Sequence, residues 1–392
     1  MYCYMATSIH ELYGKKVDMF SLKNDVRSNY SRLSSTHHAK IYSIFSKREV
    51  KHRDCPVCGT YTENKPLVVV HGGVYLKCDN CSHFFVGNSL DEQETVKFYE
   101  NDKQYSSTYT DVKTANLRVT EVSIPKAKWV LEEFKRKYGY FPKKVLDVGA
   151  GAGHVVKAFK DLGIDAQGIE ISKDAVKFAK EVFNLNLDAV DFVSHHQKYI
   201  TNPPDVIMFW GVLEHVHNPS NFLDSARKIL IANEGSIVSA VPNINSGSAV
   251  VQSLFDDETT YRNISPEAHL HMFSLKSIDT LYNNNGVVPF SRWFIGMDAY
   301  EFWTQLVTCN RIEYLKENKD TFLLKIKEAL DKFSVPNTVL VPISNLVNFI
   351  INAQGEIDHL SALPLIEELQ KSFDLSRSTD EIITMGKVIR DM

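Results

Sequence analysis

The stretch Val145-Leu-Asp-Val-Gly-Ala-Gly-Ala-Gly153 decides the fold expected for this chain. Lys144–Val148 has the composition of a buried strand, and His154–Leu162 has the spacing of a helix. The loop between them holds three glycines at alternate positions, Gly149, Gly151 and Gly153. Glycine permits a tight turn and lets a ligand lie against the backbone, while the start of a helix presents N–H groups that are not bonded within the helix. The stretch therefore predicts a strand, a ligand-binding loop and a helix in succession.

Two acidic residues indicate which ligand this loop prefers. A dinucleotide-binding loop has the form G-x-G-x-x-G, but here His154 takes the last position. Asp147 stands two residues before the first glycine, and Glu170 lies in the next expected strand, Ala166–Ile171. Asp147 suits the ammonium group of a sulfonium cofactor with an amino-acid tail, and Glu170 can accept from both ribose hydroxyls. NAD binding and a tight turn without any ligand are the alternatives.

The alternation of strands and helices continues beyond the loop. Helices are expected at Pro125–Tyr138, Lys173–Phe183, Pro219–Ile231 and Leu275–Asn284, and strands at Asp205–Trp210, Ser236–Val241 and Val287–Ile295. Strands separated by helices in this way give a parallel, doubly wound sheet. The chain after Met297 is expected to be helical for about eighty residues, until the strand-like segment Glu381–Ile389.

A second group of polar residues follows strand Asp205–Trp210, in the segment Gly211-Val-Leu-Glu-His-Val216. Open α/β sheets place ligands at this carboxyl edge of their strands. His215 accepts a proton near neutral pH because the unperturbed histidine pKa is about 6.5, and Glu214 can orient it or act as the base itself. His269 and His271 are further candidates for the base or for substrate contacts. The alternative is that Glu214 and His215 only cap a helix.

Taken together, Asp147-x-Gly149-x-Gly151-x-Gly153, Glu170 and the segment Gly211–Val216 resemble the successive motifs of class I S-adenosylmethionine-dependent methyltransferases. The resemblance covers roughly residues 126–296, and Leu-Glu-His-Val is similar to the version in small-molecule and sugar methyltransferases. It implies a Rossmann-like sheet of seven strands whose final strand is antiparallel, which Glu381–Ile389 can supply.

S-adenosylmethionine is therefore the expected cofactor. Its adenine is expected to contact Asp191 by hydrogen bond and Phe192 by stacking, since both residues follow the expected third strand. Phe209 and Trp210 are expected to wall its methionine part. The full expected set of binding residues is Asp147, Gly149, Gly151, Gly153, Glu170, Asp191, Phe192 and Trp210.

Four cysteines form two knuckles, Cys55-Pro-Val-Cys58 and Cys78-Asp-Asn-Cys81, separated by residues 59–77. Two such knuckles complete a tetrahedral site of four thiolates, and this spacing is typical of zinc ribbons. A closed site of this kind predicts a structural Zn²⁺ with no catalytic role. Four unrelated free thiols are the alternative.

The order of ribbon, tyrosine-rich connector and core is similar to a bacterial group that includes deoxysugar C-methyltransferases. That resemblance implies that the ribbon and connector cover the acceptor pocket, with Tyr99, Tyr105 and Tyr109 as the residues to examine. The mostly helical C-terminal part of this chain departs from that group.

The bulk properties restrict the class of protein further. The 392 residues suggest two or three domains, and a net charge of −4 disfavours a dedicated nucleic-acid binder. There is no apolar run of the roughly 18–20 residues that a membrane span needs, and residues 1–14 lack the regions of a signal peptide. Cysteines paired as metal ligands favour a reducing compartment, so we expect a cytoplasmic protein.

The sequence thus predicts five segments: an N-terminal extension with a helix near Ser21–Phe45 (1–50), the ribbon and connector (51–125), the methyltransferase core (126–296), a helical insertion (297–377) and the closing strand (378–392). The expected activity is methylation of a small molecule, with a sugar or nucleotide sugar as the first choice and carbon or oxygen as the acceptor atom. A methyltransferase that docks RNA or protein through the ribbon, and a cofactor-binding protein without catalysis, remain alternatives.

Overall fold

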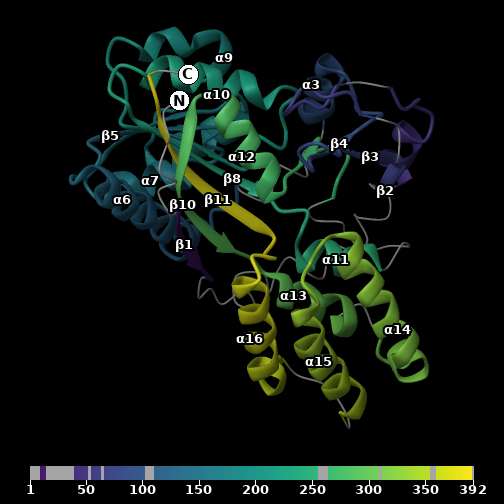
Figure 1. The fold of residues 1–392 in the computed structure, drawn as a ribbon. Coiled ribbons are helices and arrows are strands. Elements are labelled where there is room, and N and C mark those ends of the chain that lie inside the picture. The colour runs from purple at the N-terminus through teal and green to yellow at the C-terminus, as the bar shows by residue number, and fades with distance from the viewer. Residues whose placement is uncertain are drawn as a thin grey trace, which may run out of the picture.

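The computed structural model describes residues 9–14, 39–51, 54–62, 66–101, 110–254, 264–308, 311–353 and 359–390. They form a large sheet with helices, a small sheet beside it, and a group of helices below both (Figure 1). The large sheet and the small sheet share one apolar cluster, and the small sheet and the lower helices share another. The three parts therefore pack as one body.

Seven strands form the large sheet, in the order β1-β10-β11-β8-β7-β5-β6. Their bounds are β1 (His10–Tyr13), β5 (Lys144–Val148), β6 (Asp165–Ile169), β7 (Val206–Trp210), β8 (Ser236–Pro242), β10 (Val287–Ile295) and β11 (Glu381–Val388). β11 runs antiparallel to β10 and β8, and the other neighbours are parallel. The predicted α/β class, with seven strands and one late antiparallel strand, is confirmed.

Two strands differ from the expectation. The third strand, expected before Asp191, is reduced to a single bridge between Ile169 and Asp188. The seventh strand is instead β1, which lies parallel to β10 at the far edge, where Tyr13 stacks on Phe294. The N-terminal extension predicted for residues 1–50 therefore contributes a strand to the sheet, because backbone pairing with β10 builds β1 into it.

The helix expected near Ser21–Phe45 lies largely outside the described residues. Its last part, residues 39–45, is helical, and Ile41 and Phe45 are fully buried there. Both side chains join the apolar cluster of the small sheet, which includes Val70 and Tyr75. This short helix is thus a packing element of the small sheet.

The sheet is covered on both faces because alternate residues of its strands point to opposite sides. In β5, Val145 packs with one cluster and Leu146 with the other. The helices around this sheet are α5 (Ala115–Arg118), α6 (Ile124–Tyr138), α7 (His154–Asp161), α8 (Lys173–Phe183), α9 (Phe192–His195), α10 (Pro219–Leu230) and α12 (Leu275–Asn284). Ser172 caps α8 and Ser274 caps α12, each accepting from a backbone N–H of the first turn, so both helices begin where the sequence predicts.

The small sheet contains β2 (Pro66–Val70), β3 (Gly73–Lys77), β4 (Phe84–Val86) and β9 (His271–Met272), all antiparallel. Helix α3 (Glu92–Asn101) follows β4 in the chain. β2 to β4 come from the cysteine-containing segment, whereas β9 comes from the segment that follows β8 by about thirty residues. A piece of the core chain is therefore an edge strand of this small sheet. Because β2 to β4 lie beside the cysteine knuckles, we call the sheet β2-β3-β4-β9 the cysteine-containing sheet.

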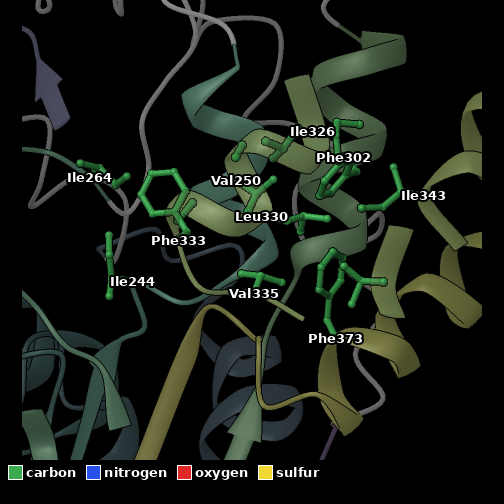
Figure 2. Packing of buried hydrophobic residues seen from close by; sticks show 14 of the residues in the cluster. Ile244, Val250, Ile264, Phe302, Ile326, Leu330, Phe333, Val335, Ile343 and Phe373 are labelled. Carbon is green, nitrogen blue, oxygen red and sulfur yellow. The ribbon is translucent and has the colours of Figure 1, made fainter. Parts of the chain in front are cut away.

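The chain between β10 and β11 is helical, as predicted, and leaves and returns at the pair Ile295 and Glu381. It contains α13 (Asp298–Trp303), α14 (Ile312–Lys332), α15 (Leu340–Asn352) and α16 (His359–Leu375), which pack with α11 (Gly247–Ser253). Figure 2 shows the apolar side chains of this group, with Phe302, Leu330 and Phe373 pointing toward one another. The exact boundaries of the five predicted segments stay predictions.

α14 has 21 residues, but charged side chains alternate with its apolar ones. In the part of the chain that the structure describes, no helix is both long and apolar enough to cross a bilayer.

Candidate active site

The glycine loop between β5 and α7 holds three glycines that differ in what surrounds them. Gly149, Gly151 and Gly153 all have positive φ angles, of 70°, 52° and 80°. A Cβ at Gly149 would lie 2.6 Å from Val212 Cγ2, and one at Gly153 would lie 3.0 Å from Leu185 Cδ1. At Gly151, no heavy atom of the described residues lies within 4 Å of that position. Gly149 and Gly153 thus let the loop pack tightly, while Gly151 borders open space in front of it.

Two acidic side chains lie next to this loop. Glu170 accepts hydrogen bonds from Gly151 N at 2.7 Å and from Ser172 N at 2.8 Å, so it ties the loop to the end of β6. Asp147 is buried, and among the described residues its Oδ1 has no hydrogen-bond partner. Burial, with the nearby charge of Glu170, raises the pKa of Asp147 to about 8. A buried carboxyl without a partner is suited to pair with a cationic group of a ligand.

The Gly211–Val216 segment lies beside the glycine loop because β7 is the neighbour of β5. Glu214 is buried, its Oε2 finds no partner within the described chain, and burial raises its pKa to about 8. His215 Nε2 lies 3.9 Å from Glu214 Oε1. The two side chains therefore face each other at the carboxyl edge of the sheet.

The protonation state of His215 follows from its other ring nitrogen. Nδ1 lies 2.8 Å from the carbonyl oxygen of Ala268, which can only accept, so Nδ1 carries the proton and Nε2 the lone pair. The ring of His269 lies 4.9 Å from that of His215, centroid to centroid. Burial, with the nearby His269, lowers the pKa of His215 well below its usual value. At neutral pH His215 is an uncharged acceptor whose lone pair is on Nε2.

Comparison with known proteins agrees with this geometry. Residues 127–289 match a family model described as a methyltransferase domain. This chain carries a methyltransferase domain. Over 155 residues the chain is 28% identical to the ubiquinone biosynthesis O-methyltransferase of Glaesserella parasuis, covering 36% of this chain and 61% of that protein. Over 100 residues it is 32% identical to the protein of the same description from Actinobacillus pleuropneumoniae serotype 7, covering 24% of this chain and 43% of the relative.

Similar solved structures include a SAM dependent methyltransferase from Archaeoglobus fulgidus, with a TM-score of 0.37 and 16% identity over 67% of this chain and 94% of that one. The plantazolicin methyltransferase BamL has a TM-score of 0.42 and 13% identity, over 76% of this chain and 94% of that one.

The residues expected around adenine have other contacts in the methyltransferase domain. Asp191 caps α9 by accepting from Ser194 N at 2.8 Å. Phe192 is only 2% exposed, and its ring packs on Phe209 and Phe222. Phe209 is itself fully buried. Phe192 and Phe209 therefore act in the core of the domain, and this geometry gives no support to Phe192 as a stacking surface or to Phe209 as a pocket wall.

The expectation for His271 needs a correction. His271 is 1% exposed, and both of its ring nitrogens are within hydrogen-bond distance of protein atoms. Nε2 donates to the carbonyl oxygen of Val216 at 2.9 Å, and Nδ1 lies 3.0 Å from His83 Nε2. A buried imidazole bonded at both nitrogens has no lone pair to offer a substrate, so His271 is a structural residue of the methyltransferase domain. His269, in contrast, lies beside His215.

The four cysteines come together in the predicted way. Their Sγ atoms lie within 4.8 Å of one another, and the pairs Cys55–Cys81 and Cys58–Cys78 are 3.6 Å apart. Thiolates at about 2.3 Å from a tetrahedral zinc ion are about 3.8 Å from each other, so the four sulfurs fit a Zn²⁺ ion. Each knuckle also closes with one backbone hydrogen bond, Gly59 N to Cys55 O and Ser82 N to Cys78 O.

Sequence reasoning missed two residues near the site. The Nζ of Lys126 lies 4.8 Å from the Trp210 ring centroid and 3.2 Å from Glu381 Oε1, which brings α6 and β11 to the end of β7. His83, the residue before β4, reaches His271. Neither residue has a local sequence signal, because its partner is more than 80 residues away in the chain.

The connector tyrosines were expected to cover the acceptor pocket. Tyr105 and Tyr109 lie outside the described residues, as does the side chain of Tyr99, so that expectation stays a prediction.

Proposed function

We propose that this protein transfers a methyl group from S-adenosylmethionine to a small-molecule acceptor. The observation that carries the proposal is the arrangement at one sheet edge, where the glycine loop and its two carboxyls stand next to Glu214 and His215. The match of residues 127–289 to a methyltransferase domain and the names of the relatives support the same activity.

The residues at the loop fit S-adenosylmethionine. The space in front of Gly151 admits a ligand against the backbone, and the unpartnered Oδ1 of Asp147 can accept from an ammonium group. Glu170 is the proposed partner of the ribose hydroxyls. Asp191 and Trp210 remain proposed contacts. When bound, the cofactor supplies an electrophilic methyl group on a sulfonium centre.

The acceptor side of the proposal rests on Glu214 and His215. Methyl transfer to oxygen or to an acidic carbon requires that the acceptor lose a proton. His215 donates from Nδ1 to Ala268 O and therefore carries its lone pair on Nε2, the atom proposed to take that proton. Glu214 faces Nε2 and, with a pKa of about 8, can accept a proton only once it is ionised. We therefore assign the base to His215 and its orientation in part to Glu214.

A sugar or nucleotide sugar is the proposed acceptor class, methylated at carbon or oxygen. The order of ribbon, connector and core supports it, and the names of the relatives favour oxygen as the acceptor atom. The main alternative is a macromolecule docked by the ribbon. Against it, the cysteine-containing sheet includes β9, whose residues adjoin His215, so this sheet is part of the acceptor edge and not an outlying module.

The four cysteines are proposed to hold a structural Zn²⁺. All four ligands come from the protein, so a tetrahedral ion has no position left for substrate. Thiolate ligands persist in a reducing compartment, which is the basis for proposing a cytoplasmic location.

Calorimetric titration with S-adenosylmethionine and S-adenosylhomocysteine tests the proposal first. We expect micromolar binding, weakened by at least about tenfold in Asp147→Ala and in Glu170→Ala. Asp174→Ala is the matched control, since Asp174 is an exposed acid in the first turn of α8. A folded protein that binds neither compound would overturn the cofactor assignment. Methyl transfer from labelled S-adenosylmethionine to a panel of nucleotide sugars, phenols, RNA and protein then decides the acceptor class.

A further inference from the structure

The loops that carry the proposed base are joined by a reciprocal set of hydrogen bonds. His215, on the loop after β7, donates from Nδ1 to Ala268 O at 2.8 Å. His271, on the segment that contains Ala268, donates from Nε2 to Val216 O at 2.9 Å and from its backbone N to Glu214 O at 3.2 Å. Each loop thus donates to a carbonyl of the other. We name the segment Ala268–His271 the clasp.

The clasp is in turn held by the cysteine-containing sheet. Its end lies in β9, where His271 pairs with Phe85, and Val86 N donates to Leu270 O at 3.0 Å. Tyr75 donates from its hydroxyl to His269 O at 2.8 Å. These three contacts come from β3 and β4, so the main chain of the clasp follows the position of that sheet.

One side chain next to this sheet, that of His83, hydrogen-bonds directly to the clasp. His83 is fully buried, follows the second cysteine knuckle by two residues, and places Nε2 3.0 Å from His271 Nδ1. Because Val216 O requires the proton on His271 Nε2, the Nδ1 of a neutral His271 has only a lone pair. His83 must then be the donor. The carbonyl of Val216 therefore fixes both hydrogen bonds: His83 Nε2 donates to His271 Nδ1, and His271 Nε2 donates to Val216 O.

We infer that His83 is a positioning residue of the proposed base: it fixes His271, and His271 fixes the main chain around Glu214 and His215. The inference rests on the proposed function, since it takes His215 as the group that accepts the proton. It gives the cysteine-containing sheet a role beyond covering the acceptor pocket. A correctly placed clasp keeps Ala268 O opposite His215 Nδ1, which holds the reactive tautomer.

Replacing His83 by residues that differ in one property tests this inference. His83→Phe keeps a ring to stack on Phe273, which lies 4.8 Å away, but removes the donor. His83→Gln keeps an N–H donor near the ε position. His196→Phe is the control, because His196 is half-buried in the short helical segment after α9 and its Nδ1 hydrogen-bonds the nearby Val193 O.

We expect His83→Phe to lower kcat by about 10- to 100-fold, the size of loss seen when the hydrogen-bond partner of a metal-ligating histidine is removed. S-adenosylmethionine affinity and the acceptor KM are expected to stay within about twofold, and His83→Gln to recover most of kcat. Wild-type kcat in a folded, zinc-loaded His83→Phe protein would overturn the inference, as would a parallel loss of cofactor affinity. If that chain fails to fold, His83→Asn takes its place, since its amide is too short to reach the ε position.

A second measurement needs no turnover. The imidazole ¹⁵N shifts of His215 report which nitrogen carries the proton, and we expect the Nδ1–H form in the wild type and a mixture in His83→Phe. An unchanged tautomer in that variant would contradict the inference even if no acceptor were known. Failure of the proposed function gives a different result, namely a wild-type protein that binds no S-adenosylmethionine while the tautomer still depends on His83.

Discussion

The glycine loop and the Glu214–His215 loop lie side by side at one sheet edge, yet they are fixed in different ways. The glycine loop is shaped by its own backbone: three positive φ angles, a strand before it and a helix after it, within residues 144–161. The acceptor-side loop is fixed from outside, by Ala268 and His271 on the clasp and, through them, by His83.

This difference teaches that one edge combines a locally encoded loop, proposed to bind the cofactor, with a second loop, proposed to face the acceptor, that is held by distant segments. A unit whose shape comes mainly from its own φ angles tolerates changes elsewhere in the fold better than one held by distant hydrogen bonds. An assembled unit depends on every segment that holds it. The two sites are therefore expected to respond separately to perturbation, and each experiment below either separates them or shows that they are coupled.

Removal of the proposed zinc ion is expected to have the largest effect. Structural zinc sites contribute on the order of 10 kcal/mol to folding, so a chelator is expected to unfold the cysteine-containing sheet. Hydrogen exchange is the measurement: amides of residues 66–86 are expected to lose protection, while those of residues 144–154 keep it. Loss of protection in both segments at once would show that the two sites form a single cooperative unit.

His215→Gln is expected to have the next largest effect. Loss of a general base lowers kcat by about 10²- to 10⁴-fold, whereas S-adenosylmethionine affinity is expected to change by less than about twofold. Steady-state kinetics beside calorimetry separates the two quantities. A variant with normal kcat would show that His215 is not the base, and a variant that no longer binds the cofactor would show that the two loops are coupled.

Gly151→Ala perturbs the cofactor side alone. Its Cβ would project into the open space in front of the loop and crowd a bound ligand, at a cost of about 1–3 kcal/mol, which is about a 5- to 150-fold loss of cofactor affinity. Gly163→Ala is matched, because Gly163 also has a positive φ, of 80°, and open space around its Cβ position, but lies at the end of α7. Calorimetry of both variants is the test. Equal cofactor affinities in Gly151→Ala and Gly163→Ala would show that the cofactor does not bind in front of Gly151.

The pH dependence of cofactor binding is expected to be the smallest effect. Since the pKa of Asp147 is about 8 in the free protein, this side chain is mostly protonated at pH 6. A cationic ligand favours the carboxylate, so binding releases a proton and affinity rises with pH up to about 8, by roughly fivefold between pH 7 and pH 8. Titrations at both pH values test the sign. Asp147→Asn is expected to bind more weakly but with a flat profile, and a wild-type affinity that falls with rising pH would contradict this role.

Elements with strong local signals were predicted well. The ranges expected for β5, α8, α12 and β10 coincide with those observed, because a buried apolar run defines each strand and a serine cap starts each helix. The glycine loop belongs to the same class, since its φ angles and its neighbouring carboxyls are encoded within about 25 residues.

Elements that depend on distant partners were not predicted. β1 contains only four residues, and its place in the sheet comes from pairing with Ser291–Phe294, some 280 residues later. The sequence made His271 a candidate for the base or for substrate contacts, but its ring is bonded to His83, 188 residues earlier in the chain. No local pattern carries such a pairing, so only the assembled fold distinguishes a structural histidine from a reactive one.

The position of β11 has a consequence for the order in which the protein folds. β11 lies between β8 and β10, although it is the last of the described strands to be synthesised, and β1 must wait for β10 before it has any partner. During synthesis, β8 and β10 therefore each have an edge without its final neighbour until residues 381–388 leave the ribosome. Unpaired edges of this kind favour aggregation. The chain is thus expected to have its greatest need for chaperone protection just before β11 is inserted.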